Sequence, residues 1–239
     1  MTTNEKTCAA FILRLLLDDD APARLPDTLG WDELARLGRR NVVLVRLAER
    51  LESAGERPPA SFVAAVEEER RSNGEKMRLA RHVSRACEEA GVPFILAKAF
   101  QHYPDMGDDV DLYVTGRSAD VDAVVLKGLS AVAHKRSLTD RLAAARCYSV
   151  RGSKAKLDIH HGRLWAYGDH DSFIAALIKN ARRVPVEGAE FDVPSPEDLL
   201  VVEATQRVYG RSCIRLAPVV NTIATLRRGA LDWDYVLRA

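Results

Sequence analysis

The sequence predicts an α/β (α+β) fold in which a small mixed sheet is flanked by helical regions at both ends of the chain. Before about residue 90, apolar residues recur at helical spacing. From Gly91 onward, short apolar runs of strand length are separated by turns, and a helix-start signal returns at Ser195. We therefore expect a helical N-terminal region at 1–90, an α/β core at 91–194 and a helical C-terminal region at 195–239.

The N-terminal region shows the periodicity of several amphipathic helices. Apolar residues share one helical face in residues 8–17 and again in 34–51. Pro58 and Pro59 end this segment, and the pattern of residues 60–89 predicts one long helix. Gly74 lies inside that helix and could divide it in two.

The central region is expected to contain four strands and one helix. The strands are predicted at 92–96, 110–114, 146–150 and 156–160, with a helix at about 119–133. The turn Arg151-Gly152-Ser153-Lys154 separates the last two strands, which predicts that they pair as an antiparallel hairpin. A mixed sheet with helices on one face follows from this order.

The chain returns to helix after a further short helix and strand pair. We expect the helix at 171–179 and the strands around Val184 and Phe191. Ser195 then supplies a helix N-cap and Pro196 the first helical residue, so a C-terminal helical part begins there.

Composition limits the partners of the protein. Hydrophobic residues make up 47% and charged residues 29% of the 239 residues, which is typical of a globular protein. The net charge is +1, so the overall electrostatic field does not attract long nucleic acids. A small molecule, a protein or a locally bound RNA remains possible as a partner.

Neither the cysteines nor the N-terminus points to secretion. The four cysteines, Cys8, Cys87, Cys147 and Cys213, are far apart and have no CxxC spacing, which disfavours a zinc cluster or a disulfide framework. The first residues lack a basic signal-peptide segment, and Arg14 interrupts the first apolar run. We expect a cytoplasmic protein that has no membrane span.

Two acidic residues alternate with apolar residues on the second predicted strand. Asp109 and Asp111 share one face of that strand, roughly 6–7 Å apart along the chain, while Val110 and Leu112 face the core. Like charges repel at such a distance unless a cation lies between them, and carboxylate oxygens suit Mg²⁺. The pair therefore indicates a divalent-metal site, although an acidic turn before the strand would give the same pattern.

A third carboxylate lies on the last predicted strand of the core. Asp158 alternates with Leu157 and Ile159, so it can reach the same surface from a neighbouring strand. Three carboxylates from two strands match the needs of two-metal phosphoryl or nucleotidyl transfer. The alternative is that Asp158 is an edge residue hydrogen-bonded to a backbone amide.

These pieces resemble a known family when they are read in order. The segments that carry the resemblance are Phe94-Ile95-Leu96-Ala97-Lys98-Ala99, His102-Tyr103-Pro104, Asp109-Val110-Asp111-Leu112, Leu157-Asp158-Ile159-His160, Pro194 to Leu200 and Leu231-Asp232-Trp233. Together they look like the uncharacterised bacterial nucleotidyltransferases of the polymerase-β-like superfamily. The resemblance covers about Gly91 to Ala239, and it implies a small mixed sheet of the nucleotidyltransferase type.

The resemblance also implies a reaction and a set of ligands. Asp109, Asp111 and Asp158 would be the catalytic carboxylates and would hold Mg²⁺ or Mn²⁺. The donor would be a nucleoside triphosphate such as ATP, bound in part by Lys98 and Ala99, and the acceptor would be a hydroxyl on a small molecule, protein or RNA. The product is the acceptor carrying a nucleoside monophosphate.

The chain departs from the family pattern in ways that keep two alternatives open. Lys98-Ala99-Phe100 stands where such enzymes have a glycine-rich turn, and a Cβ at Ala99 crowds the approach to phosphates. A degenerate nucleotidyltransferase fold acting as a binding module is therefore the first alternative. The second is a metal-dependent phosphodiesterase that uses Asp158, His160 and His161.

Overall fold

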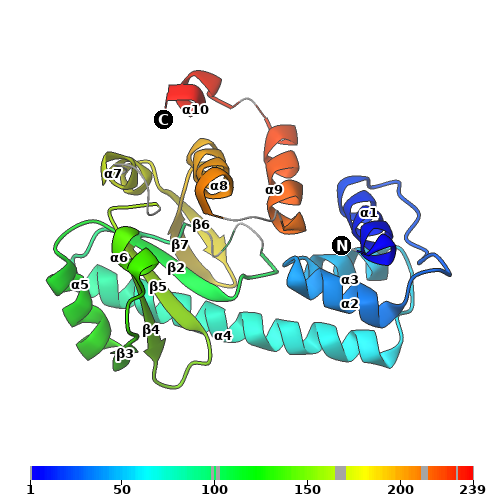
Figure 1. The fold of residues 1–239 in the computed structure, drawn as a ribbon, viewed down its shortest axis with the longest axis horizontal. Helices are drawn as coiled ribbons and strands as arrows, with labels where there is room; N and C mark the ends of the chain where they lie inside the picture. Colours follow the sequence, from blue (N-terminus) through cyan, green and yellow to red (C-terminus); the bar gives the residue numbers. More distant parts are fainter. Residues whose placement is uncertain are drawn as a thin grey trace. The chain divides into compact units, whose positions relative to one another are not determined.

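The computed structural model describes residues 2–97, 100, 103–164, 171–210, 215–229 and 231–238. The chain forms two compact units, and Figure 1 shows the succession of their elements along the chain. The first unit comprises residues 1–74, 101–106 and 213–229, and the second comprises residues 75–100, 107–212 and 230–239. The three regions expected from the sequence remain a prediction about domain organisation.

The first unit is helical, as the sequence predicts for the N-terminal part of the chain. Its elements are α1 (Thr3–Leu17), α2 (Trp31–Arg40), α3 (Leu44–Ser53), the first part of α4 (Ala60–Ala90) and α9 (Leu216–Arg227). A capping box begins α1, because the Thr2 side chain accepts from the Glu5 amide and the Glu5 carboxylate accepts from the Thr2 amide. The helix α4 passes through Gly74 without a break, so the prediction of one long helix is confirmed and the possible division at Gly74 does not occur.

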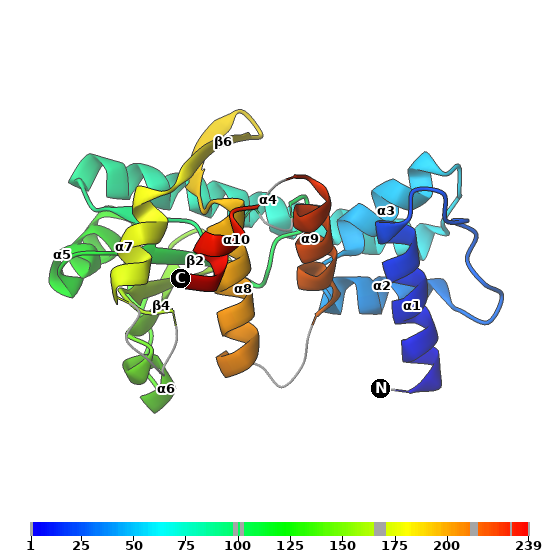
Figure 2. The ribbon, with the colours of Figure 1, turned by 90° about the horizontal axis from the view of Figure 1, so that it is seen from above.

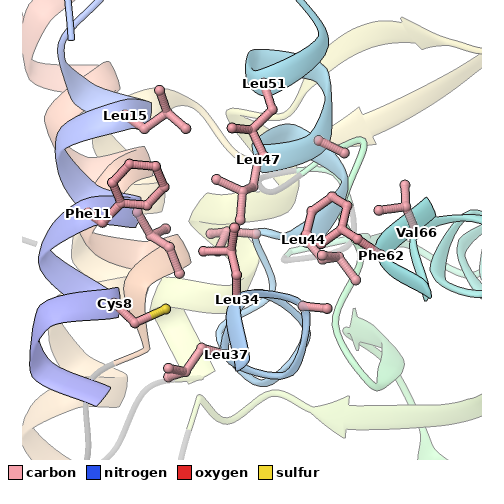
Figure 3. Packing of buried hydrophobic residues seen from close by; sticks show 14 of the residues in the cluster. Cys8, Phe11, Leu15, Leu34, Leu37, Leu44, Leu47, Leu51, Phe62 and Val66 are labelled. Carbon is pink, nitrogen blue, oxygen red and sulfur yellow. The ribbon is translucent and has the colours of Figure 1, made fainter. Parts of the chain in front are cut away.

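The core of the first unit is built from the apolar faces of these helices. Figure 3 shows Phe11 and Leu15 of α1, Leu47 of α3 and Phe62 of α4 directed into one cluster. The rings of Trp31 and Phe62 meet edge to face with centroids 5.2 Å apart. Helical spacing of apolar residues therefore produces a continuous core, which stabilises helices that would be marginal alone.

A buried carboxylate caps one helix of this unit. Asp105 is 1% exposed and accepts hydrogen bonds from the backbone amides of Val45 (2.8 Å) and Arg46 (3.1 Å) at the first turn of α3. The Arg46 Nε also donates to Asp105 (3.1 Å), and its Nη1 donates to Asn221 of α9 (2.8 Å). Since Val43, the N-cap of α3, makes no side-chain capping bond, Asp105 supplies the missing acceptor.

The second unit contains a mixed sheet, as the sequence predicts, but with five strands in place of the four expected. Its strands, in spatial order, are β1 (Phe94–Ile95), β2 (Asp109–Val114), β5 (Lys156–His161), β4 (Ala145–Val150) and β3 (Ala131–Ala133). Only β2 and β5 pair in parallel, whereas the other neighbours are antiparallel. The predicted β4–β5 hairpin is confirmed.

One predicted helix ends early because the chain turns into an edge strand. Residues 119–133 were expected to be helical, but α5 (Ser118–Ala123) continues only into the π-helical turn η1 (Val124–Gly128). Ser130 then has a positive φ of 50°, and β3 pairs with β4. A three-residue strand carries too little alternation to be recognised, and the short helix α6 (Leu138–Leu142) was also missed.

Helices cover both faces of the sheet, so the expectation of helices on one face is wrong. On one face Tyr148 of β4 donates a hydrogen bond to Asp122 of α5, and Arg146 forms an ion pair with the same carboxylate. On the other face a buried cluster joins Tyr113 of β2 to α7 (Asp171–Lys179) and to α8 (Pro196–Gly210).

The predicted strand pair is the hairpin of β6 (Arg182–Val186) and β7 (Ala189–Val193). Its two-residue loop, Glu187-Gly188, has positive φ at both positions (47° and 75°), which suits a tight turn between twisted strands. Leu96 donates a backbone hydrogen bond to Asp192 of β7 (3.3 Å), which links the hairpin to the end of β1.

The predicted start of the C-terminal helix is also confirmed. Ser195 caps α8 by accepting from the Asp198 amide (3.1 Å). Figure 2 shows the short helix α10 (Trp233–Arg238) beside α8. The Tyr235 hydroxyl donates to Asp198 (2.5 Å) and accepts from Asn180 (3.3 Å), so α10 is held on the second unit by polar contacts. Among the helices that the structure describes, none has the length and apolar character to cross a membrane.

Candidate active site

The three predicted aspartates lie on adjacent strands and on one face of the sheet. In the parallel pair of β2 and β5, Asp111 is the direct partner of Asp158 and Asp109 is the partner of Lys156. Because partners in register share a face and side chains alternate along a strand, Asp109, Asp111 and Asp158 project from the same face. All three are partly buried, whereas Val110 and Leu112 between them are fully buried on the opposite face.

A buried histidine holds Asp111. The Nε2 of His160 lies 3.3 Å from Oδ1 of Asp111, and the imidazole stacks on the Tyr113 ring with centroids 4.6 Å apart and an interplanar angle of 13°. His160 is the strand partner of Tyr113, so the register itself brings the rings together. The side chains of Asp111 and His160 are only 14% and 10% exposed.

A thiol accompanies Asp158. Cys147 of β4 is the direct partner of Asp158 across the antiparallel pair. Burial raises the pKa of the Cys147 thiol to about 12, and a hydrogen bond to Asp158 together with the charges of Asp158 and Asp109 acts in the same direction. Cys147 is therefore a protonated neighbour of the carboxylates rather than a thiolate nucleophile.

The carboxylates offer oxygen ligands but do not form a finished metal cage. Within the described ranges, no three His, Cys, Asp or Glu side chains are arranged to hold a metal ion together. Oδ1 of Asp158 is nevertheless buried and without a hydrogen-bond partner among these residues, which is costly unless a cation or water compensates it. A hollow of about 460 Å³ lies between α4 and η1, where His82 and Val124 are among its lining residues, and none of the three aspartates lines it.

The same face of the sheet carries further polar residues that the sequence motifs did not indicate. Lys156 is exposed and lies in register between Asp109 of β2 and Ser149 of β4. The Nε2 of His134 lies 2.7 Å from the Ser149 hydroxyl. The alternation Lys156-Leu157-Asp158 was visible in the sequence, but the pairing of Lys156 with Asp109 depends on strand register.

The two histidines after Asp158 do not form one cluster. His160 shares the face of Asp158, whereas His161 projects from the opposite face, where burial lowers its pKa and the charges of Asp122 and Arg136 act on it. The arrangement expected for a phosphodiesterase that uses both histidines is therefore absent from this part of the sheet.

Lys98 and Ala99, the predicted nucleotide-binding turn, lie outside the described residues. Phe100 next to them packs on Phe191 of β7 with ring centroids 4.3 Å apart.

The chain matches a known protein family in sequence and resembles a solved structure. No curated protein matches the chain. Among solved structures, the crystal structure of ANT(2'')-Ia in complex with adenylyl-2''-tobramycin is similar, with a TM-score of 0.46 and 15% sequence identity over 67% of this chain and 92% of that chain. The sequence of residues 27–239 matches an uncharacterised nucleotidyltransferase family, so the match begins well before Gly91, within the helical first unit. The chain belongs to that family of uncharacterised nucleotidyltransferases.

Proposed function

We propose that the protein transfers a nucleoside monophosphate from a nucleoside triphosphate to an acceptor hydroxyl, with pyrophosphate as the leaving group. The observation that carries this proposal is the direct pairing of Asp111 with Asp158 on adjacent parallel strands, with Asp109 on the same face. Three carboxylates gathered on one surface repel one another, which destabilises the fold unless a cation binds there. Family membership supplies the reaction class.

The donor set fits a hard divalent cation, Mg²⁺ or Mn²⁺. Asp109, Asp111 and Asp158 would hold it, and the buried Oδ1 of Asp158 provides an oxygen that lacks a partner within the described part of the chain. When bound, the metal would neutralise the phosphate charge and polarise the acceptor hydroxyl. The three carboxylates would have to move closer together around the cation, because no three of the described His, Cys, Asp or Glu side chains are now arranged to hold one.

The residues of the chain would orient the reactants and accept the proton that the acceptor hydroxyl loses. Asp158 would accept the proton of the acceptor hydroxyl while the oxygen of that hydroxyl attacks the α-phosphorus. The bond from the α-phosphorus to the bridging oxygen breaks, and the electron pair leaves with pyrophosphate. Lys156, beside Asp109, would bind a phosphate oxygen as a point charge.

A labelled transfer assay tests the proposal. The protein is incubated with each α-³²P-labelled nucleoside triphosphate, Mg²⁺ or Mn²⁺, and a panel of small-molecule, peptide and RNA acceptors. We expect label on one acceptor class and equimolar pyrophosphate, and no transfer in the presence of a chelator. Consumption of the triphosphate without labelled acceptor would instead indicate a hydrolase.

Thermal stability distinguishes an active enzyme from a degenerate binding module. A ligand that binds only the native state stabilises it by RT ln(1 + [L]/Kd), about 2.7 kcal/mol at a ligand concentration of 100 Kd. We expect millimolar Mg²⁺ and a nucleoside triphosphate together to raise the melting temperature more than the sum of their separate effects. A shift with nucleotide that is indifferent to the metal would favour the binding module, in which the carboxylates hold no cation.

Lys156 should contribute to donor binding. Lys156→Ala removes one positive charge beside Asp109, and a charge-assisted hydrogen bond to phosphate contributes about 1.5–3 kcal/mol. At about 1.4 kcal/mol per tenfold, KM for the triphosphate should rise by roughly 10-fold or more. Lys154→Ala is the matched control, because Lys154 is an exposed lysine of the adjacent turn. Equal KM values for the two variants would exclude Lys156 from the donor site.

A further inference from the structure

We propose that His160 is a positioning residue that orients the Asp111 carboxylate for the divalent cation. This inference rests on the proposed function, because it requires that Asp111 binds a metal. It goes beyond the family assignment, which assigns no role to the histidine two residues after the third carboxylate.

The hydrogen bond defines what His160 does to Asp111. An ionised carboxylate can only accept, so Nε2 of His160, 3.3 Å from Oδ1, must be the donor. The distance is long for a hydrogen bond, which leaves room for Asp111 to adjust when a cation arrives. Such a bond limits rotation of the carboxylate and fixes which of its oxygens faces the neighbouring strand. Hydrogen bonds from neighbouring groups to metal-ligating carboxylates have this orienting effect in known metal sites.

The histidine is itself held rigidly. His160 is 8% exposed, and its ring lies almost parallel to the ring of Tyr113 at 4.6 Å. Tyr113 is fully buried in the cluster that contains Ile174 and Leu177 of α7 and Val202 of α8. The helices of the second unit therefore fix the tyrosine ring, the tyrosine ring fixes the imidazole, and the imidazole orients Asp111.

The surroundings favour an orienting role over a purely structural one. A histidine retained only to stabilise the fold would be expected to use both ring nitrogens when it is buried, since an unpaired buried polar atom costs free energy. Nδ1 of His160 is buried and has no hydrogen-bond partner among the described residues. The remaining polar contact, at Nε2, is directed at one of the three carboxylates of the candidate site.

Three substitutions of His160 test separately its hydrogen-bond donor, its aromatic ring and the length of its side chain. His160→Gln places an amide nitrogen near the position of Nε2 and keeps the donor. His160→Asn carries the same amide but is too short to reach Asp111, and His160→Phe keeps the stack on Tyr113 while removing the donor. The amide pair is matched in polarity, so the comparison stands even if His160→Phe does not fold.

Direct metal binding is the decisive readout, with Mn²⁺ titrated into each full-length protein and free Mn²⁺ followed by electron paramagnetic resonance. We expect Mn²⁺ affinity to fall by about 10- to 100-fold in His160→Asn and His160→Phe, the range for loss of such supporting contacts, and to stay within a few-fold of wild type in His160→Gln. In the transfer assay, the KM for Mg²⁺ should rise in His160→Asn and His160→Phe, while kcat at saturating metal changes little.

The other outcomes separate this inference from the proposed function. Wild-type affinity in all three variants would overturn the positioning role and leave the metal site intact. An equal loss in all three, together with a lower melting temperature, would show that His160 is structural and would also overturn the inference. Absence of Mn²⁺ binding in the wild-type protein would overturn the proposed metal site itself, and the positioning role with it.

Discussion

Replacement of Asp109 by asparagine should reduce kcat by at least about 10³-fold, because metal-ion stabilisation of the transition state contributes several kcal/mol and each 1.36 kcal/mol is a factor of ten. Asparagine keeps the size and an oxygen ligand but removes one negative charge from the face that also carries Asp111 and Asp158. The measurement is single-turnover transfer of label at saturating Mg²⁺ and triphosphate.

Stability should move in the opposite direction, which separates a catalytic role from a folding role. Removing a charge from a repelling cluster relieves unfavourable interactions when no metal is bound, so the melting temperature of Asp109→Asn without metal should equal or exceed that of wild type. Addition of Mg²⁺ should stabilise wild type more than the variant. Asp108→Asn is the control: Asp108 is an adjacent, exposed aspartate, and its substitution should leave kcat near the wild-type value. Near-normal activity of Asp109→Asn would remove the main support for an enzyme at this site.

Much of the sheet could be predicted because its strands carry local patterns. Asp109 to Val114 and Lys156 to His161 alternate polar and apolar residues, and each became a strand within one residue of the expected bounds. The edge strand β3 could not be recognised, because Ala131-Val132-Ala133 continues a helical composition and is fixed only by its pairing with β4. A strand with alternating polar and apolar residues can be recognised from its own sequence, whereas a short edge strand such as β3 forms because of its pairing with a neighbouring strand.

The candidate site was predictable in its residue types but not in its contacts. Alternation alone indicated that Asp109 and Asp111 share a face, and the parallel pairing of β2 with β5 brought Asp158 opposite Asp111. The pairings of Cys147 with Asp158 and of Lys156 with Asp109 depend on the register between strands that are distant in sequence, which a single sequence does not specify. Side-chain neighbours across strands therefore had to come from the structure.

Outside the candidate active site, a large loss of stability should follow substitution of Asp105. This carboxylate is buried and accepts from the amides of Val45 and Arg46 and from the Arg46 guanidinium. Asp105→Ala would leave two backbone amides at the start of α3 without their acceptor. It would also remove the acidic partner of Arg46, whose side chain is 17% exposed. Breaking a buried ion pair by removing one partner costs about 3–5 kcal/mol. We expect the free energy of unfolding, measured with urea, to fall by that amount.

Two further variants test the cause of this loss. Asp27→Ala, at an exposed aspartate of the same unit, should change the unfolding free energy by no more than about 0.5 kcal/mol. Asp105→Asn keeps one acceptor oxygen for the amides of α3 but removes the charge that pairs with Arg46, so its loss should lie between those of the other two variants. If Asp105→Asn were as destabilising as Asp105→Ala, the ion pair would dominate over the helix cap. If Asp105→Ala cost no more than Asp27→Ala, the burial of Asp105 against α3 would have no energetic role.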